Sequence, residues 1–185
     1  IPPPFPPFRI YNFKDRQLPV AAEDGQGNDV LDKIIGQDKE YISNLVPDMY
    51  QGVTELHDLI LVFDDLSGAD SLFLFLQGWL FPTDASINVN ISQSSKHRSI
   101  FPYLQVPDTN ENWTTVVESM GFPKGKNKTM VLDLTDKFIS DDYRLRIRTN
   151  MQIYWDHIFI SNSGSGHPIQ TISLKPASAD LHYRG

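Results

Sequence analysis

Apolar and polar residues alternate most clearly in the second half of the chain. In the run RLRIR, Leu145 and Ile147 alternate with Arg144, Arg146 and Arg148. A two-residue period is that of a β-strand with one buried and one solvated face. A long strand of this kind is typical of an antiparallel sheet that is covered on one side only. The pattern therefore predicts both apolar residues in the core and the three arginines on an outer sheet face.

Seven further segments have the length and composition of strands, with turn residues roughly every ten positions. They are 59–65, 72–81, 86–92, 102–106, 113–117, 129–135 and 169–174. The segment 72–81 is apolar on both faces over Leu72–Leu76, which indicates a central strand, whereas 86–92 alternates Ile and Val with Asn. About eight strands with these spacings predict an all-β fold, an antiparallel β-sandwich.

The first 54 residues differ from this pattern. Five prolines within residues 1–8 favour an extended arm, which Phe5 and Phe8 would pin to the surface, although a recognition role for the proline run is the alternative. We expect residues 1–54 to form this arm and a short helical segment, packed on a sandwich domain of residues 55–185. Together they would make one compact unit.

The helical segment is expected between two turns. The sequence VLDKII at 30–35 predicts a short helix, which Asn28 or Asp29 would cap. Gly36 would end it in the left-handed conformation, as glycine commonly does after a helix. A second helical turn is expected at 38–42. We expect these turns to cover one end of the sandwich.

Composition narrows the class of protein. The chain has 185 residues, a net charge of −7 and no cysteine. This length suits one domain, and the negative charge argues against a general nucleic-acid binder, because phosphate binding needs a cationic surface. The longest apolar runs fall short of the ~20 residues that span a bilayer, so membrane insertion is not expected. The absence of cysteine excludes disulfides and leaves the compartment open, with an extracytoplasmic one slightly favoured.

The order of motifs in residues 55–175 resembles galactose-binding-like jelly-roll modules. The motifs are a tryptophan opening a strand in WTTV, an Asp-Leu strand end in VLDLT, the arginine-rich YRLRIRTN and the aromatic-Asp stretch IYWDHIFI. The blocks GWLFPTDASINVNISQS, PYLQV, GFPKGKNKTMVLDL, RIRTNMQIYWD and SADLHYRG are also similar to segments of large bacterial proteins with tetratricopeptide, FG-GAP and ASPIC-type regions. The resemblance implies a jelly roll, carbohydrate binding and a place within a larger multidomain protein. Both termini of the sequence, which has no initiating methionine, agree with that expectation.

The block GWLFPTDAS at 78–86 contains the first candidate ligand-binding residues. Pro82 would end the strand and place Asp84 and Ser86 in a turn beside Trp79. A tryptophan next to hydrogen-bonding groups suits a sugar, because the ring covers the C–H face and acceptors hold the hydroxyls. The alternative is structural: Trp79 would pack in the core, and Asp84 would bond to the amides of its own turn.

The sequence YWDH contributes the second pair of candidates, Tyr154 and Asp156. Consecutive strand residues point to opposite faces, so Trp155 and His157 should share one side and Tyr154 and Asp156 the other. With Trp155 in the core, the other pair would face solvent or a ligand. A catalytic Asp–His pair is the less favoured alternative, because no nucleophile motif of the G-x-S-x-G type accompanies it.

Trp113, Arg146 and Arg148 are the remaining candidates. In the modules that the chain resembles, an arginine at such a position contacts the ligand, and guanidinium groups can hold an anion. The alternative is that the arginines are paired with acidic side chains of the protein itself. The candidates for that pairing are Asp133 and Asp141 or Asp142.

The prediction of a metal site depends on a single turn. Asp64, Asp65 and Asp70 crowd carboxylates around Ser67, and jelly-roll modules often hold a structural calcium ion, which prefers six to eight oxygen ligands. The spacing does not fit the helix-loop-helix calcium loop, so solvation of the turn is the alternative. The five histidines are scattered without metal-binding spacing, and no other cofactor is expected.

The sequence therefore predicts a non-catalytic carbohydrate-binding module whose partners are carbohydrate or neighbouring domains of a larger protein. The alternative is a structural domain that joins its neighbours and has no small-molecule ligand. A glycoside-directed enzyme, with carboxylates such as Asp84 and Asp156 as its acid and base, is the third choice. An open groove that holds a tryptophan with polar neighbours would favour the first reading.

Overall fold

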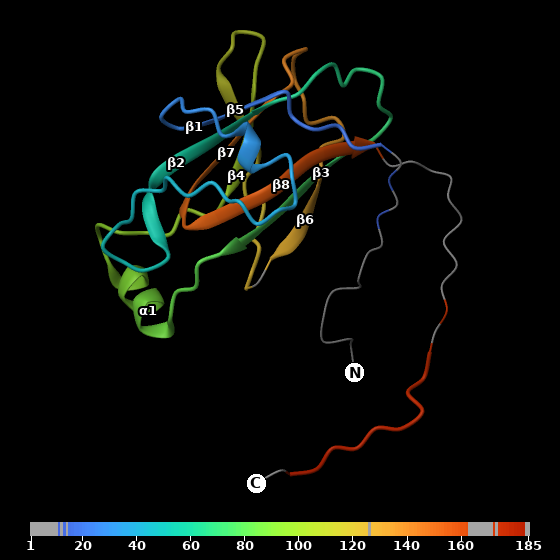
Figure 1. The fold of residues 1–185 in the computed structure, drawn as a ribbon. Coiled ribbons are helices and arrows are strands. Elements are labelled where there is room, and N and C mark those ends of the chain that lie inside the picture. The colour runs from blue at the N-terminus through green and yellow to red at the C-terminus, as the bar shows by residue number, and fades with distance from the viewer. Residues whose placement is uncertain are drawn as a thin grey trace.

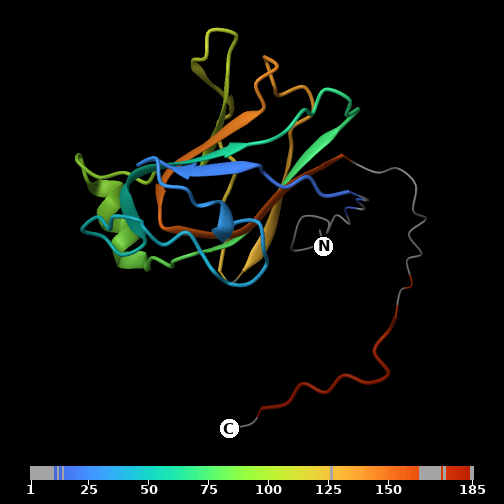
Figure 2. The ribbon, with the colours of Figure 1, turned by 45° about the horizontal axis from the view of Figure 1, so that its top comes forward.

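Two antiparallel sheets face each other in the computed structural model, which describes Tyr11, Phe13, 15–125, 127–162, Ile172 and 174–183. The larger sheet has the order β1 (Ala21–Asp24), β2 (Val53–Val62), β7 (Arg144–Met151), β4 (Tyr103–Pro107) and β5 (Trp113–Val117). The smaller sheet has the order β6 (Lys128–Asp133), β3 (Leu72–Leu80) and β8 (Ile153–Asn162). Figures 1 and 2 show these two layers, with helix α1 (Ala85–Gln93) at one end. The expected all-β sandwich is confirmed.

The core lies between the two sheets and is almost entirely aliphatic. Leu145 and Ile147 of β7 are 0% and 1% exposed, and they face Leu74 and Leu76 of β3, which belong to the same cluster of buried side chains. Burying a side chain of this size contributes about 1.5–3 kcal/mol. The two-residue period of β7 therefore places its apolar residues and its arginines as predicted.

The outer face of the smaller sheet is also apolar, and the start of the chain covers it. Phe75 and Phe159 stack with ring centroids 4.7 Å apart. Phe13 packs at a tilted angle against both rings, and Tyr11 packs edge-on against Phe75. Covering both faces explains why β3 is apolar on both faces over Leu72–Leu76. The phenylalanines expected to pin the arm belong to residues 1–8, which lie outside the described residues.

The predicted strand at 86–92 is wrong, because this segment forms the helix α1. Asp84 caps it: its Oδ1 accepts a hydrogen bond of 2.8 Å from the amide of Ile87. Ile87 and Ile91 are four residues apart and so share a helix face, of which Ile91 is buried, whereas Val89 is 52% exposed. Over only seven residues, an alternation of Ile and Asn also fits a helical period.

The helical segment before β2 is shorter than predicted. Only a single 3₁₀ turn, η1, forms at Leu31–Lys33, and residues 38–42 are not helical. Gly36 does not adopt the left-handed conformation. The chain here follows the free edge of β8 instead: the amide of Ile158 donates to the carbonyl of Ile34 at 2.8 Å. A sheet edge that needs partners has overridden the local helical preference.

The strand expected at 169–174 lies largely outside the described residues. Ile172 and Leu174 are described, and neither belongs to a strand. Both side chains are exposed. Between 174 and 183 the chain runs clear of the sheets (Figure 1). For the two described positions, the strand prediction is therefore wrong.

A β-bulge in β8 changes which residues face the core. Gln77 pairs with His157 but the adjacent Gly78 pairs with Trp155, so Asp156 is an extra residue in β8. Trp155 stays in the core at 3% exposed, whereas His157 contacts the ring of Phe159 on the opposite face. The prediction that Trp155 and His157 share a side is wrong, because an extra residue reverses the alternation.

A larger irregularity interrupts β2. Val53 pairs with Met151 and His57 with Thr149, so four positions along β2 match two along β7. The extra backbone of β2 bonds to the preceding loop instead: the amide of Glu55 donates to the carbonyl of Val46 at 2.9 Å. The loop before β2 is therefore held against this end of the larger sheet.

The bulge in β8 predicts a sharp difference between two glycine variants. A Cβ at Gly78 would meet the carbonyl oxygen of Tyr154 at 2.5 Å, whereas a Cβ at Gly68 would meet nothing within 4 Å. We expect Gly78→Ala to lower the free energy of unfolding by about 1–3 kcal/mol, as overpacking does. Gly68→Ala is the matched control and should be neutral in a urea titration. Equal stability of the two variants would contradict the tight packing of β3 on the bulge.

Candidate functional site

Five of the seven predicted ligand-binding residues lie on two separate outer sheet faces, whereas Asp84 caps α1 and Asp156 is buried. On the smaller sheet, Trp79 stacks on Tyr154 with centroids 4.7 Å apart and planes inclined by 15°, and Tyr41 packs edge-on against both. Gln152 donates to the Tyr154 hydroxyl at 2.6 Å. Trp79 is half-buried, so neither proposed role is fully met: it is not in the core, and one ring face is covered by a neighbouring aromatic ring.

Trp113, Arg146 and Arg148 do share a face, that of the larger sheet. The guanidinium of Arg146 lies 4.6 Å from the centre of the Trp113 ring and donates to Gln105 Oε1 at 2.8 and 2.5 Å. Arg148 Nε lies 2.8 Å from Asp58 Oδ1, directly across from it on β2. These groups lie together as the sequence suggested, but their hydrogen bonds go largely to one another.

The internal partners of the arginines differ in part from those expected. Asp142 does pair with Arg144 at 2.5 Å, and this hydrogen bond holds the pKa of Asp142 below its usual value. Asp133 is not a partner, because β6 belongs to the smaller sheet while β7 belongs to the larger one. Asp58, which the sequence did not single out, takes its place. Cross-strand pairs at this exposure contribute about 0.2–1 kcal/mol each.

Asp84 and Asp156 have structural partners. Hydrogen bonds from the Ile87 amide and the Ser86 hydroxyl lower the pKa of Asp84, which caps α1 as described. Asp156 is 0% exposed, so the expectation that it faces solvent or a ligand is wrong. Its Oδ1 accepts from the Lys39 amide at 2.9 Å, and among the described residues Oδ2 has no hydrogen-bond partner. The bulge turns this carboxylate under the segment that covers β8.

The expected calcium ligands do not form a cluster in the described part of the chain. No group of three or more acidic or histidine side chains there lies close enough together to hold a metal ion. The Asp65 carboxylate instead accepts from the Ser67 amide at 2.9 Å, and this bond lowers its pKa. Asp65 therefore stabilises its own turn, which was the alternative to calcium binding.

A cavity of about 240 Å³ lies beside the irregular part of β2. A second one, of about 410 Å³, lies between the segments 15–17 and 160–162 and is more open. The walls of the cavity beside β2 come from three separate segments: the turn at 24–26, the loop at 42–46 and β2 at 55–59. Side chains of the core, among them Ile147 and Trp155, close its inner end. An apolar interior with a few polar groups near the opening is the usual form of a small-ligand site.

Asp24 fixes the wall on the side of the turn. Its carboxylate accepts hydrogen bonds from the amides of Gln26 and Asn28, at 2.8 and 2.9 Å, and from both the Asn28 and Asn44 side chains. Burial alone would raise the pKa of Asp24, but these hydrogen bonds outweigh it and leave the pKa below its usual value. Asp24 is therefore a charged anchor that ties Asn44 of the covering loop to β1.

His57 lines the opposite wall and is held neutral. Burial lowers its pKa below the ordinary value of 6.5, against the smaller effects of the Glu55 carbonyl and the Asp58 charge. Its Nδ1 lies 3.1 Å from the Glu55 carbonyl and 3.0 Å from Thr54 Oγ1, which itself donates to a backbone carbonyl. Because the Glu55 carbonyl can only accept, the tautomer that satisfies this contact carries its proton on Nδ1 and leaves Nε2 as an acceptor.

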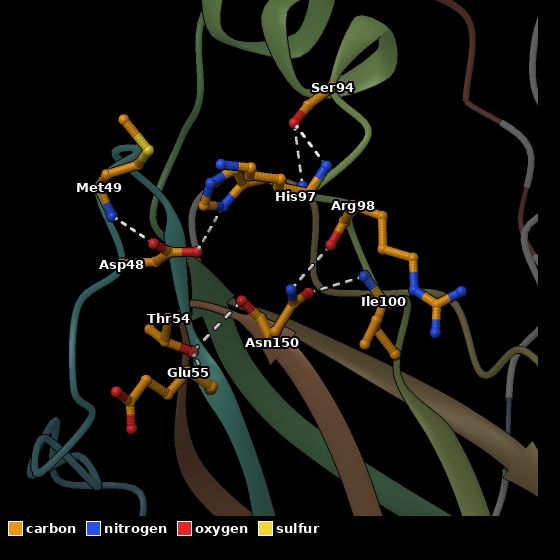
Figure 3. A network of polar contacts seen from close by, with 10 residues as sticks. Asp48, Met49, Thr54, Glu55, Ser94, His97, Arg98, Ile100 and Asn150 are labelled. Carbon is orange, nitrogen blue, oxygen red and sulfur yellow. Dashed lines mark hydrogen bonds and ion pairs between the residues drawn. The ribbon is translucent and has the colours of Figure 1, made fainter.

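A network of polar contacts fixes the base of this end of the sandwich (Figure 3). The Asn150 side chain donates to the Arg98 carbonyl at 2.9 Å and accepts from the Ile100 amide at 2.7 Å. His97, at the end of the α1 segment, lies 3.2 Å from Asp48 of the covering loop. The loop is therefore anchored at both ends, by Asp24 and by Asp48, and the cavity beneath it is preformed.

Of the residues that line this cavity, only Arg148 was named from the sequence as a ligand-binding candidate. His57, Asp24 and Asn44 lie on segments with no recognisable motif, and their meeting depends on the irregular pairing of β2. Two local features were present in the sequence: the turn DGQGN at 24–28, and the polar stretch that contains Glu55, His57 and Asp58 before the apolar run 59–63. Neither of these local features predicts that the turn and His57 lie close together.

The two buried histidines predict a loss of stability in mild acid. The pKa of His57 is lowered by burial, and that of His157 by burial and by the charge of Arg16. The unfolded chain binds a proton near pH 6.5, so below that pH it binds more protons than the folded chain, and folding becomes less favourable. Each histidine contributes at most about 1.4 kcal/mol per pH unit.

We therefore expect the free energy of unfolding to fall between pH 7.5 and 5.5, above the range in which carboxylates titrate. His57→Gln and His157→Gln should each flatten this dependence, as measured by urea unfolding across the pH series. An unchanged pH dependence in both variants would show that neither histidine is held neutral by the fold.

Comparisons with known proteins add no assignment to this geometry. No protein-family model, curated protein or solved structure matches the chain. Among the described residues, no helix has both the length and the apolar character needed to cross a membrane. The function is therefore argued from the cavity and from the two outer faces alone.

Proposed function

We propose that this chain is a non-catalytic carbohydrate-binding module, and that the cavity beside β2 is its binding site. The observation that carries the proposal is the cavity itself, with its preformed walls and its combination of an aromatic inner end and polar opening. Its volume of about 240 Å³ suits one small ring. Drug-sized ligands need ~300–1,000 Å³.

The chemistry of the lining supports a ligand with hydroxyl groups. Asn44, His57 and Glu55 bring amide, imidazole and carboxylate groups to the walls, which can exchange hydrogen bonds with several hydroxyls. Trp155 and the aliphatic core residues offer apolar surface to ring C–H groups. A sugar ring presents both kinds of surface.

Strand pairing supports the finer expectation of a jelly roll. β4 pairs with β5, β3 with β6 and β2 with β7, so the pairs are nested around the β4–β5 hairpin. Before β1, Gln17 bridges to Ile160 of β8 and continues the nesting outward. Nested antiparallel pairs split between two sheets are what a rolled-up hairpin produces, the arrangement of a jelly roll.

A structural domain that joins its neighbours is the second candidate. It is favoured by the C-terminal segment 174–183, where Leu174, Leu181 and Tyr183 are almost fully exposed. Both views show this segment, in red, running away from the sheets (Figures 1 and 2). Large apolar side chains in water indicate a surface that meets another protein segment.

Fluorescence tests the binding site directly. Replacing two of the three tryptophans, in a Trp79→Phe/Trp113→Phe double variant, leaves Trp155 at the inner end of the cavity as the only reporter. We expect at least one member of a panel of monosaccharides to change Trp155 emission in a saturable way. Because the double variant lacks both outer-face tryptophans, such a signal reports on the cavity.

A matched pair of variants locates the site. Val46→Phe fills the opening of the cavity, whereas Val20→Phe adds the same ring at a similar exposure, 49% against 43%, away from it. We expect the first to weaken binding at least ten-fold and the second to leave it unchanged, as measured by calorimetry. Loss of binding with Trp113→Phe, but not with Val46→Phe, would move the site to the outer face. No binding by any sugar would favour the second candidate.

A further inference from the structure

Several donors that line the cavity are already bonded within the protein. Arg148 directs its Nε toward Asp58 Oδ1 at 2.8 Å. The Thr149 hydroxyl donates to the Ile100 carbonyl at 2.7 Å. The side-chain amide of Asn44 donates to Asp24, which as a carboxylate can only accept. Arg148 keeps its Nη groups and Asn44 a second N–H, so only part of the donor capacity of the lining is used.

Acceptors remain available on both walls. With its amide nitrogen bound to Asp24, Asn44 keeps its Oδ1 for another partner. His57 keeps a bare Nε2, because its Nδ1 proton faces the Glu55 carbonyl and Thr54. The Glu55 side chain is exposed at the rim, and no described side chain pairs with its carboxylate. An acceptor-rich cavity selects a ligand that donates hydrogen bonds.

Carboxylates outnumber cations among the side chains that line the cavity, while Arg146, outside the lining, also lies 3.9 Å from Asp58. Three carboxylates, those of Asp24, Glu55 and Asp58, line it together with the single guanidinium of Arg148. Arg148 balances Asp58, and His57 adds no positive charge because it is neutral at pH 7. Two negative charges therefore lack a counter-charge among the described lining residues. The potential in the cavity favours a cation and opposes a sugar acid, sulfate or phosphate.

We propose that the cavity selects an amino sugar, a hydroxyl-rich ring that carries a protonated primary amine. The ring hydroxyls donate to Asn44 Oδ1 and His57 Nε2, and the ammonium group lies at the rim against the Glu55 carboxylate. This proposal rests on the proposed function, since it names the ligand class of the same site. The proposal also reverses the ligand charge that the arginines alone would predict, which is negative. Their guanidinium groups are engaged with other side chains on the outer face of the larger sheet.

Three probes that share one ring test the proposal. Glucosamine, glucose and glucuronic acid are titrated at pH 7 and low ionic strength into the Trp79→Phe/Trp113→Phe double variant. We expect glucosamine to bind at least about five-fold more tightly than glucose, the size of one exposed charge pair. Glucuronic acid should bind more weakly than glucose. In ~0.5 M salt the preference should shrink, because exposed charges are screened.

Two charge-matched variants assign the preference to the rim. Glu55→Gln removes the carboxylate at the opening, and Glu23→Gln removes an exposed carboxylate of β1 that does not line the cavity. We expect only Glu55→Gln to abolish the preference for glucosamine, with both variants folded in thermal melts. Equal affinities for glucosamine and glucose, or tightest binding of glucuronic acid, would overturn the proposal and leave the carbohydrate site in place. Failure of all three sugars and of the wider panel would overturn both.

Discussion

The cavity depends on one constraint, the need of every backbone N–H and C=O of β2 to find a partner. Between Val53 and His57, β2 has four residue steps where β7 has two, so part of its backbone cannot pair within the sheet. The loop before β2 supplies the missing partners through Val46 and Pro47. An unpaired buried amide or carbonyl costs as much as a lost hydrogen bond, so the loop is held close to the sheet. The space that remains beneath it is the cavity.

The same need of polar groups for partners explains the polarity of the two outer faces. On the larger sheet, the arginines of β7 meet Asp58, Asp142, Gln105 and the Trp113 ring, which satisfy most of their charge and donors. On the smaller sheet, aromatic rings cover one another and the start of the chain covers Phe75 and Phe159. Both faces are therefore largely satisfied from within. Unpaired acceptors remain beside the step where β2 departs from its neighbour and, on β8, at Asp156 Oδ2.

Sequence patterns predicted the parts of this fold that repeat and missed the parts that do not. Leu145 and Ile147 were placed correctly because β7 keeps its two-residue period over its whole length. The position of Asp156 was wrong because one extra residue in β8 reverses the alternation, and no residue type marks a bulge of this kind. The alternation at 86–92 was misread because Ile87 and Ile91 also fit a helix, and the capping position of Asp84 was the signal that decides between the two.

The candidate site was less predictable than the fold for a physical reason. Tryptophans and arginines draw attention in a sequence, and here they have found partners on the sheet faces. Asp24, Asn44 and His57 come together only through the pairing of β1 with β2 and the irregular step within β2, which are long-range properties. Periodicity describes one strand at a time. It contains no information on which turn will lie over which strand.

The most direct test of the account is to map a bound monosaccharide on the folded chain by NMR, following each backbone amide during a titration. The account predicts saturable shifts that centre on Asn44, His57 and Thr149, with little change at Trp113, Arg146 and Trp79. Shifts that centre on either outer sheet face, with those around the irregular step of β2 unchanged, would contradict it.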